Sequence, residues 1–166
     1  TTDGMLNPGA ALAEVVEGHG RPFRIDAKGA FGAITLDACE VGFDALMASS
    51  NNCIEGVSGM GYAIIRREVI AAAAGNAHAL SLDLHDQWKA MEGNGQWRFT
   101  PPTHVLAAFD QALTEHADEG GVAGRGARYE ANRRVLVDGM RELGFETLLP
   151  DELQAPIIVT FHTPAD

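Results

Sequence analysis

The sequence of 166 residues lacks a surplus of basic side chains. Its 12 Lys and Arg residues are outnumbered by 23 Asp and Glu residues, and the formal net charge is −11. Proteins bind nucleic acid largely by neutralising phosphates with Lys and Arg, and anionic membranes attract the same side chains. We therefore expect neither nucleic acid nor a membrane as a partner. Small anions stay open as ligands, because backbone N–H groups at helix N-termini bind them whatever the net charge.

Cysteines and long apolar runs are also scarce. Cys39 and Cys53 are the two cysteines and no CxxC occurs, so we expect no disulfide framework and a reducing compartment, the cytoplasm. No apolar run has the length that spans a bilayer. What the chain does have is 46% hydrophobic residues within the length of one domain, which is typical of a globular fold with a real core.

Several motifs of well-known chemistry are absent from the sequence. It has no HExxH, no GxSxG and no phosphate-binding GxxxxGK[ST]. His78 and His85 are spaced to share a helix face, but no third ligand accompanies them, so we expect no metal site. The GVAGRG run at 121–126 is not a dinucleotide fingerprint, because no strand leads into it, and we predict that it begins a helix.

Hydrophobic periodicity and breaker residues predict an alternation of strands and helices. This alternation is typical of an α/β layered sheet, parallel over its first strands, in which ligands bind at the carboxyl ends of the strands. The predicted strands are 22–27, 43–48, 60–67 and 154–162, and the predicted helices are 8–18, 68–74, 82–91, 102–118 and 122–143.

Two segments and one acid are candidates for a site. Asp26 ends an otherwise apolar strand, where a charge is costly to bury unless a cation meets it. It is either a cap or ion-pair partner, or a carboxylate that keeps a heterocyclic nitrogen protonated, as a pyridoxal phosphate site requires. The loop SSNNCIEGVSG at 49–59 follows a strand, and Thr100 of WRFTPPTH precedes two prolines, either as a plain helix cap or as an anion donor.

Taken together, six segments resemble the class V aminotransferases of fold type I, and most closely the group that acts on 2-aminoethylphosphonate and pyruvate. The segments are TTDGMLNP, RIDAKGAFGAI, SSNNCIEGVSG, ALSLDLHDQWKAMEGNGQWRFTPPTH, EGGVAGRGARYEANRRVLVDGMRELGF and LLPDELQAPIIVTFH. The resemblance implies a three-layer α/β/α sandwich with a mainly parallel sheet. Residues 1–145 would be the central and C-terminal part of the large domain that binds pyridoxal 5'-phosphate, and 146–166 the start of a smaller C-terminal domain.

The resemblance also implies roles for particular residues. Asp26 would contact the pyridine nitrogen of the cofactor, and Thr2 and Asp3 would lie in its binding segment. Asn52, 26 residues after Asp26, stands at the position of the family's Schiff-base lysine. Thr100 would reach the cofactor phosphate of a neighbouring subunit, so a homodimer is implied. Its substrates would be a small amino donor and a 2-oxo acid.

Departures from the family pattern lie close to the expected cofactor. Asn52 replaces the lysine, Asp3 replaces a threonine, Gly29-Ala30 replaces a pair of serines, and Ser58 replaces a proline. An amide can neither form a Schiff base nor shuttle a proton between substrate and cofactor. We therefore expect the chain to be inactive as it stands. The alternatives are a degenerate, non-catalytic binding or interaction module, and another class V aminotransferase such as the alanine–glyoxylate type. The rest of the phosphate cradle and the substrate-binding arginine are expected outside the 166 residues.

Overall fold

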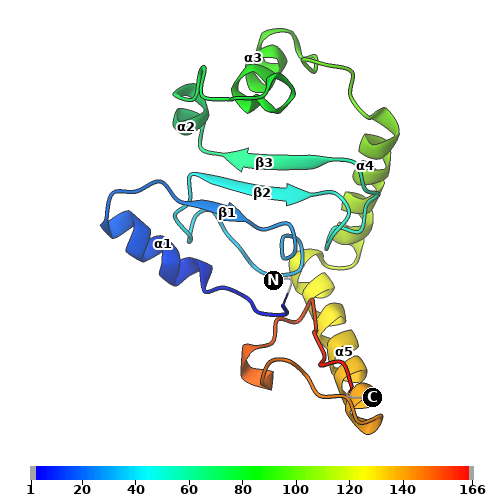
Figure 1. Ribbon diagram of the computed structural model, residues 1–166. Coiled ribbons are helices and arrows are strands. Elements are labelled where there is room, and N and C mark those ends of the chain that lie inside the picture. Colours follow the sequence, from blue (N-terminus) through cyan, green and yellow to red (C-terminus); the bar gives the residue numbers. More distant parts are fainter. Residues whose placement is uncertain (1–2, 165–166) are drawn as a thin grey trace.

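A computed structural model describes residues 3–164, as a small sheet with helices around it (Figure 1). A long column of two consecutive helices runs down one side of the sheet in the view of Figure 1. In chain order, the elements are α1 (Gly9–Gly18), β1 (Arg24–Asp26), β2 (Ala45–Ser49), β3 (Gly61–Ile65), α2 (Arg67–Ala71), η1 (Leu80–Leu82), α3 (Leu84–Asn94), α4 (Thr103–Asp118), α5 (Gly121–Glu142) and η2 (Asp151–Leu153).

The sheet has the strand order β1-β2-β3 and is mixed. β1 pairs with β2 in parallel, with Asp26 opposite Met47, and β2 pairs with β3 in an antiparallel hairpin. The expected α/β architecture is present, but the described strands do not form a mainly parallel sheet. A parallel third strand needs a long crossover, whereas here the loop after β2 returns the chain directly alongside it.

The core lies around the centre of β2. Leu46 is fully buried, and Phe43, Ala48 and Ala27 pack with it. Tyr62 on β3 connects this cluster to α4, because its ring lies 5.3 Å from that of Phe109. The sheet is therefore anchored to the helical column.

Local signals in the sequence explain where the helices begin and end. Asp83 caps α3 by accepting a hydrogen bond from the Asp86 N–H, and Gly95 ends α3 with a φ of 73°. α4 follows Pro102, and α5 begins after Gly120, so the GVAGRG run does begin a helix. No helix within residues 3–164 is long and apolar enough to cross a membrane.

The strand expected at 154–162 is not formed, and that prediction is wrong. The segment makes isolated bridges to two different partners, from Gln154 to Met5 and from Phe161 to Thr147. Pro156 has no N–H to donate, and the partner changes between the two ends of the segment, so no continuous ladder can extend along it. Residues near the amino end of the chain and those after α5 are nevertheless tied together.

Candidate active site

Asp26 is the last residue of β1 and lies at the carboxyl edge of the parallel strand pair. Its side chain is 57% exposed, so the burial that made this acid conspicuous in the sequence is not observed. The backbone N–H of Lys28 donates to Asp26 Oδ1 at 3.1 Å, and Lys28 Nζ lies 3.1 Å from Oδ2. Desolvation acts to raise the pKa of Asp26, but the hydrogen bonds and charge of Lys28 outweigh it and lower the pKa. Asp26 is a carboxylate that already has a cation beside it.

Asn52 lies in the loop after β2, at the same edge of the sheet. Its Nδ2 donates to the backbone oxygen of Lys28 at 2.7 Å and to Ser49 Oγ at 3.1 Å. Asp26 and Asn52 are thus brought together through Lys28. An amide nitrogen does not attack a carbonyl and does not titrate near neutral pH, and this one is held by two acceptors. In this structure, Asn52 links the end of β1 to the end of β2.

The loop that carries Asn52 is closed on itself around a buried serine. Ser50 is fully buried, and its hydroxyl donates to the Val57 oxygen at 2.7 Å. The N–H of Gly56 donates back to the Ser50 oxygen at 2.8 Å, and a Cβ at Gly56 would lie only 2.8 Å from that oxygen. The glycine is therefore required by a close backbone approach. Sequence reasoning did not single out Ser50, because nothing distinguishes it from the other polar residues of the loop.

Arg125 fastens this loop to the start of α5. It is 2% exposed, and its guanidinium donates to the Cys53 oxygen at 2.6 Å and to Glu119 Oε2 at 2.6 Å. Glu55 Oε2 lies 3.3 Å from Arg125, and Glu55 has a φ of +62°, a strained value for a residue with a side chain. A buried guanidinium requires such partners. Sequence reasoning assigned the segment to a helix start but missed Arg125.

A second layer of charge surrounds this contact. Arg128 donates to Glu119 and Glu55, and the Tyr129 hydroxyl donates to Glu55 at 2.6 Å. The hydrogen bond from Arg128 is the main reason why the pKa of Glu119 is lowered to about 2. Burial, followed by the hydrogen bond to Glu55, raises the pKa of Tyr129. At neutral pH the carboxylates of Glu119 and Glu55 are ionised and the Tyr129 hydroxyl keeps its proton, so the network holds the loop in place rather than supplying a base.

The other predicted site residues lie on separate segments. Thr100 is exposed in the connection between α3 and α4, and within residues 3–164 no hydrogen bond joins it to Asp26 or Asn52. Asp3 is exposed and accepts a long hydrogen bond of 3.4 Å from the Met5 N–H. Thr2 lies outside the described residues. Among the predicted site residues that the structure describes, only Asp26 and Asn52 are therefore brought together.

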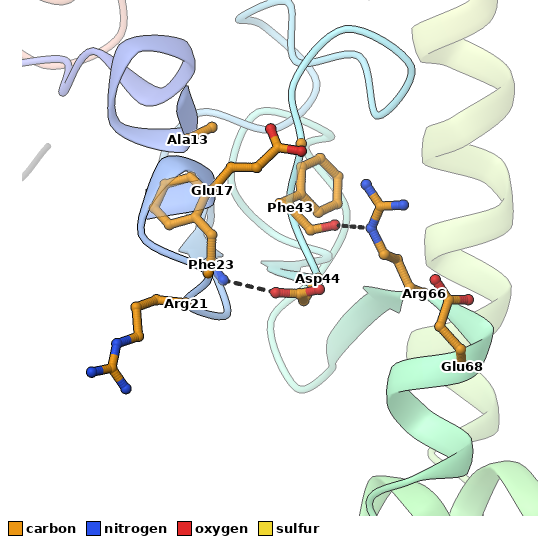
Figure 2. A pocket seen from close by; sticks show the side chains of 10 residues that line it. Ala13, Glu17, Arg21, Phe23, Phe43, Asp44, Arg66 and Glu68 are labelled. Atoms are coloured by element: carbon orange, nitrogen blue, oxygen red, sulfur yellow. Dashed lines mark hydrogen bonds between the residues drawn. The ribbon is translucent and has the colours of Figure 1, made fainter. Parts of the chain in front are cut away.

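A pocket of about 310 Å³ lies at the opposite, amino end of the parallel strands (Figure 2). Two of its polar side chains form hydrogen bonds with the backbone. Asp44 accepts from the Phe23 N–H at 2.8 Å, and Arg66 Nε donates to the Phe43 oxygen at 2.8 Å. These bonds fix the starts of β1 and β2 relative to the end of β3. The pocket is thus separate from the edge that carries Asp26.

Asp83, His85 and Asp86 gather at the start of α3 in a way that resembles a metal-ligand set. Each acid already has a partner, because Asp83 caps the helix and Asp86 pairs with Arg98 at 3.1 Å. The cluster is explained by capping and ion pairing.

Comparison with known proteins extends this description. The sequence model of the family described as aminotransferase class-V matches residues 1–165. A protein of Pseudomonas fluorescens named 2-aminoethylphosphonate–pyruvate transaminase is 54% identical over the whole chain, which spans 45% of the relative's length.

Solved structures show the same fold. Pyridoxamine–pyruvate aminotransferase from Mesorhizobium loti superposes with a TM-score of 0.86 at 22% identity, over 99% of this chain and 43% of that one. A structure of phosphoserine aminotransferase from Trichomonas vaginalis, described as having pyridoxal phosphate bound, matches with a TM-score of 0.66 at 17% identity, over 82% of this chain and 36% of that one. The fold is therefore that of an aminotransferase α/β domain. Within that class, the chain belongs to the class V aminotransferase family.

Proposed function

We propose that the chain is the cofactor-binding core of a 2-aminoethylphosphonate–pyruvate transaminase lineage, and that Asn52 leaves it without transaminase activity. The observation that supports the lineage most strongly is the 54% identity over all 166 residues to a relative of that name. The working protein would transfer an amino group from 2-aminoethylphosphonate to pyruvate, giving phosphonoacetaldehyde and alanine.

The residues at the sheet edge fit pyridoxal phosphate in part. The cofactor would supply an electron sink, which depends on a carboxylate that keeps its ring nitrogen protonated. Asp26 is such a carboxylate, more than half exposed at a strand end. Position 52 does not fit, because the Asn52 amide cannot bind the cofactor covalently and is already held by Lys28 and Ser49. We infer that this chain binds the cofactor without a covalent bond.

The geometry of Asn52 also favours a non-catalytic role over a shift of substrate. A change of substrate within the family would alter the residues that contact the amino donor, whereas the residue changed here is the reactive amine itself. In this proposal, residues 1–145 form the part of the large domain present here, and 146–166 begin the smaller one. The protein would assemble as a homodimer, with Thr100 near the cofactor phosphate of the partner subunit.

Restoring the lysine tests this function. The Asn52→Lys variant should acquire covalently bound pyridoxal phosphate that borohydride fixes at position 52 and mass spectrometry locates there. The matched control is Asn51→Lys, since Asn51 is the neighbouring exposed residue of the same loop and lies outside the hydrogen bonds to β1. The unaltered chain should show no turnover of 2-aminoethylphosphonate with pyruvate. Turnover by the unaltered chain, or a folded Asn52→Lys variant without covalent cofactor, would refute the proposal.

A further inference from the structure

Both oxygens of the Asp26 carboxylate are contacted by a single residue, Lys28. The backbone N–H of Lys28 donates to Oδ1 at 3.1 Å, and the ammonium Nζ of Lys28 lies 3.1 Å from Oδ2. Lys28 follows Asp26 by two positions and lies in the turn after β1, so the cation comes from the same stretch of chain as the acid. The ion pair does not depend on a distant element.

Residue 28 is also held from the other side. The Asn52 amide donates to its backbone oxygen at 2.7 Å, and the same amide contacts Ser49 at the end of β2. The turn after β1 is thus fixed at three points: the N–H, the side chain and the carbonyl of Lys28. This arrangement favours the conformer in which the ammonium faces Asp26.

Lys28 is one of two lysines in the sequence, and the other, Lys89, belongs to a different region. Lys89 lies on α3, with its Nζ 5.4 Å from the centre of the Trp88 ring. Both lysines are exposed. Lys28 is therefore the lysine at the edge that carries Asp26, and Lys89 serves as a natural control.

We propose that Lys28 is a built-in counter-ion of Asp26, which occupies the place that a protonated ring nitrogen would take. This inference rests on the proposed binding of pyridoxal phosphate at this edge. A ligand with a cationic ring nitrogen must displace the Lys28 ammonium before it can pair with Asp26. A ligand of the same shape without that nitrogen does not compete with Lys28. Lys28 thus weakens the binding of ligands with a cationic ring nitrogen relative to ligands of the same shape without one.

The exposure of the Lys28–Asp26 ion pair sets how strongly Lys28 changes the affinity for a ligand. The side chains of Lys28 and Asp26 are 56% and 57% exposed, so solvent weakens their attraction. Exposed pairs of this kind change an equilibrium by roughly two- to five-fold. Screening by salt should reduce the effect further.

Equilibrium dialysis of the protein with pyridoxal phosphate tests the proposal. Lys28→Met should lower the Kd by roughly two- to five-fold. Lys28→Arg, which keeps the charge, and Lys89→Met should leave the Kd unchanged. The carbocyclic analogue of the cofactor, which lacks the ring nitrogen, should bind the unaltered protein and Lys28→Met equally well. A purely structural role of Lys28 would change the binding of both ligands alike.

The Asp26→Asn background provides the decisive comparison. Without the carboxylate, Lys28→Met should no longer alter the Kd for pyridoxal phosphate. An unchanged Kd for Lys28→Met in the original background would overturn the proposal. So would borohydride capture of the cofactor on Lys28 well above that on Lys89, because Lys28 would then act as an amine toward the aldehyde.

The outcome is separable from that of the proposed function. Lys28→Met could bind the cofactor more tightly while Asn52→Lys fails to bind it covalently. This result would support the counter-ion role and refute the proposed function. If Asn52→Lys attaches the cofactor but Lys28→Met changes nothing, the lineage stands and the counter-ion role falls. If no variant binds pyridoxal phosphate, both are wrong.

Discussion

The side chain of Asn52 lies between the turn after β1 and the last residue of β2, where hydrogen bonds to Lys28 and Ser49 fix it. This amide connects backbone and side-chain acceptors without adding charge. The edge of the sheet therefore keeps one carboxylate, Asp26, and one ammonium, Lys28. A second ammonium at position 52 would bring a like charge toward Lys28, so restoring the lysine would also change the balance around Asp26.

The close approach inside the loop after β2 gives a prediction for Gly56. A Cβ at this position would lie 2.8 Å from the Ser50 oxygen, so Gly56→Ala must push the backbone apart and weaken the Gly56 N–H to Ser50 bond. We expect the free energy of unfolding to fall by about 1–3 kcal/mol in urea titrations. Gly93→Ala on α3, where a Cβ meets nothing within 4 Å, is the control and should stabilise by up to about 1 kcal/mol. Equal stability of Gly56→Ala and the original chain would contradict this account of the loop.

The sequence predicts some of the residues at the candidate site and misses others. Asp26 is a candidate because it ends an apolar strand, and Asn52 because the family resemblance implies a lysine at its position; the structure places both at one edge. The burial of Ser50 was not predicted, because nothing in the sequence distinguishes it from the other polar residues of its loop. The burial of Arg125 was not predicted, because it arises from a contact between a loop and a helix start that are distant in sequence. No local pattern encodes such a contact.

At the scale of elements, the end of α4 and the start of α5 support the loop that carries Asn52. His116 near the end of α4 contacts the Gly32 oxygen through Nε2 at 2.7 Å, and Arg125 near the start of α5 donates to the Cys53 oxygen. The two helices therefore hold the two turns that follow β1 and β2. The helical column therefore supports the candidate site from the side of the sheet along which it runs in Figure 1.

Removing Arg125 tests this support. Arg125→Met would leave the Cys53 oxygen without its donor and would leave Arg128 as the remaining guanidinium partner of Glu119 and Glu55. Removing one partner of a buried ion pair typically lowers the free energy of unfolding by about 3–5 kcal/mol. Chemical denaturation measures this loss. Arg134→Met is the matched control, because Arg134 lies on the same helix, pairs with Glu130 and is 69% exposed. Its loss should cost less than about 1 kcal/mol. Similar losses for the two variants would refute the special role of Arg125.

The elements themselves were predicted unequally well. Helix starts were found within a residue or two, because prolines and glycines mark them locally. The direction of β3 and the failure of the 154–162 segment to form a strand depend on which segments become neighbours. Apolar, β-branched composition made that segment resemble a strand, but composition does not specify a partner.

At the scale of the whole molecule, two electrostatic effects oppose each other. The net charge of −11 disfavours the compact state through self-repulsion, and this repulsion decreases as the pH falls toward the isoelectric point of about 4.8. The arginine-bound carboxylates act in the other direction. Glu119 and Glu130 both have pKa values lowered to about 2, mainly by hydrogen bonds from Arg128 and Arg133. These pairs stabilise the fold only while the carboxylates are ionised.

The pH dependence of stability follows from these two effects. A carboxylate with a lowered pKa binds fewer protons in the folded state than in the unfolded chain, so its contribution is complete above its ordinary pKa of 4.5 and is lost as the pH falls toward 2. We expect the urea midpoint to hold or rise slightly from pH 7 to about 5, as repulsion declines, and then to fall steeply below 4.5. Glu119→Gln should flatten the acid side of this curve, whereas Glu14→Gln on the exposed face of α1 should leave it unchanged. A midpoint that stays constant between pH 5 and pH 2.5 would show that the arginine network does not stabilise the molecule, and the support inferred for the loop of Asn52 would lose its electrostatic basis.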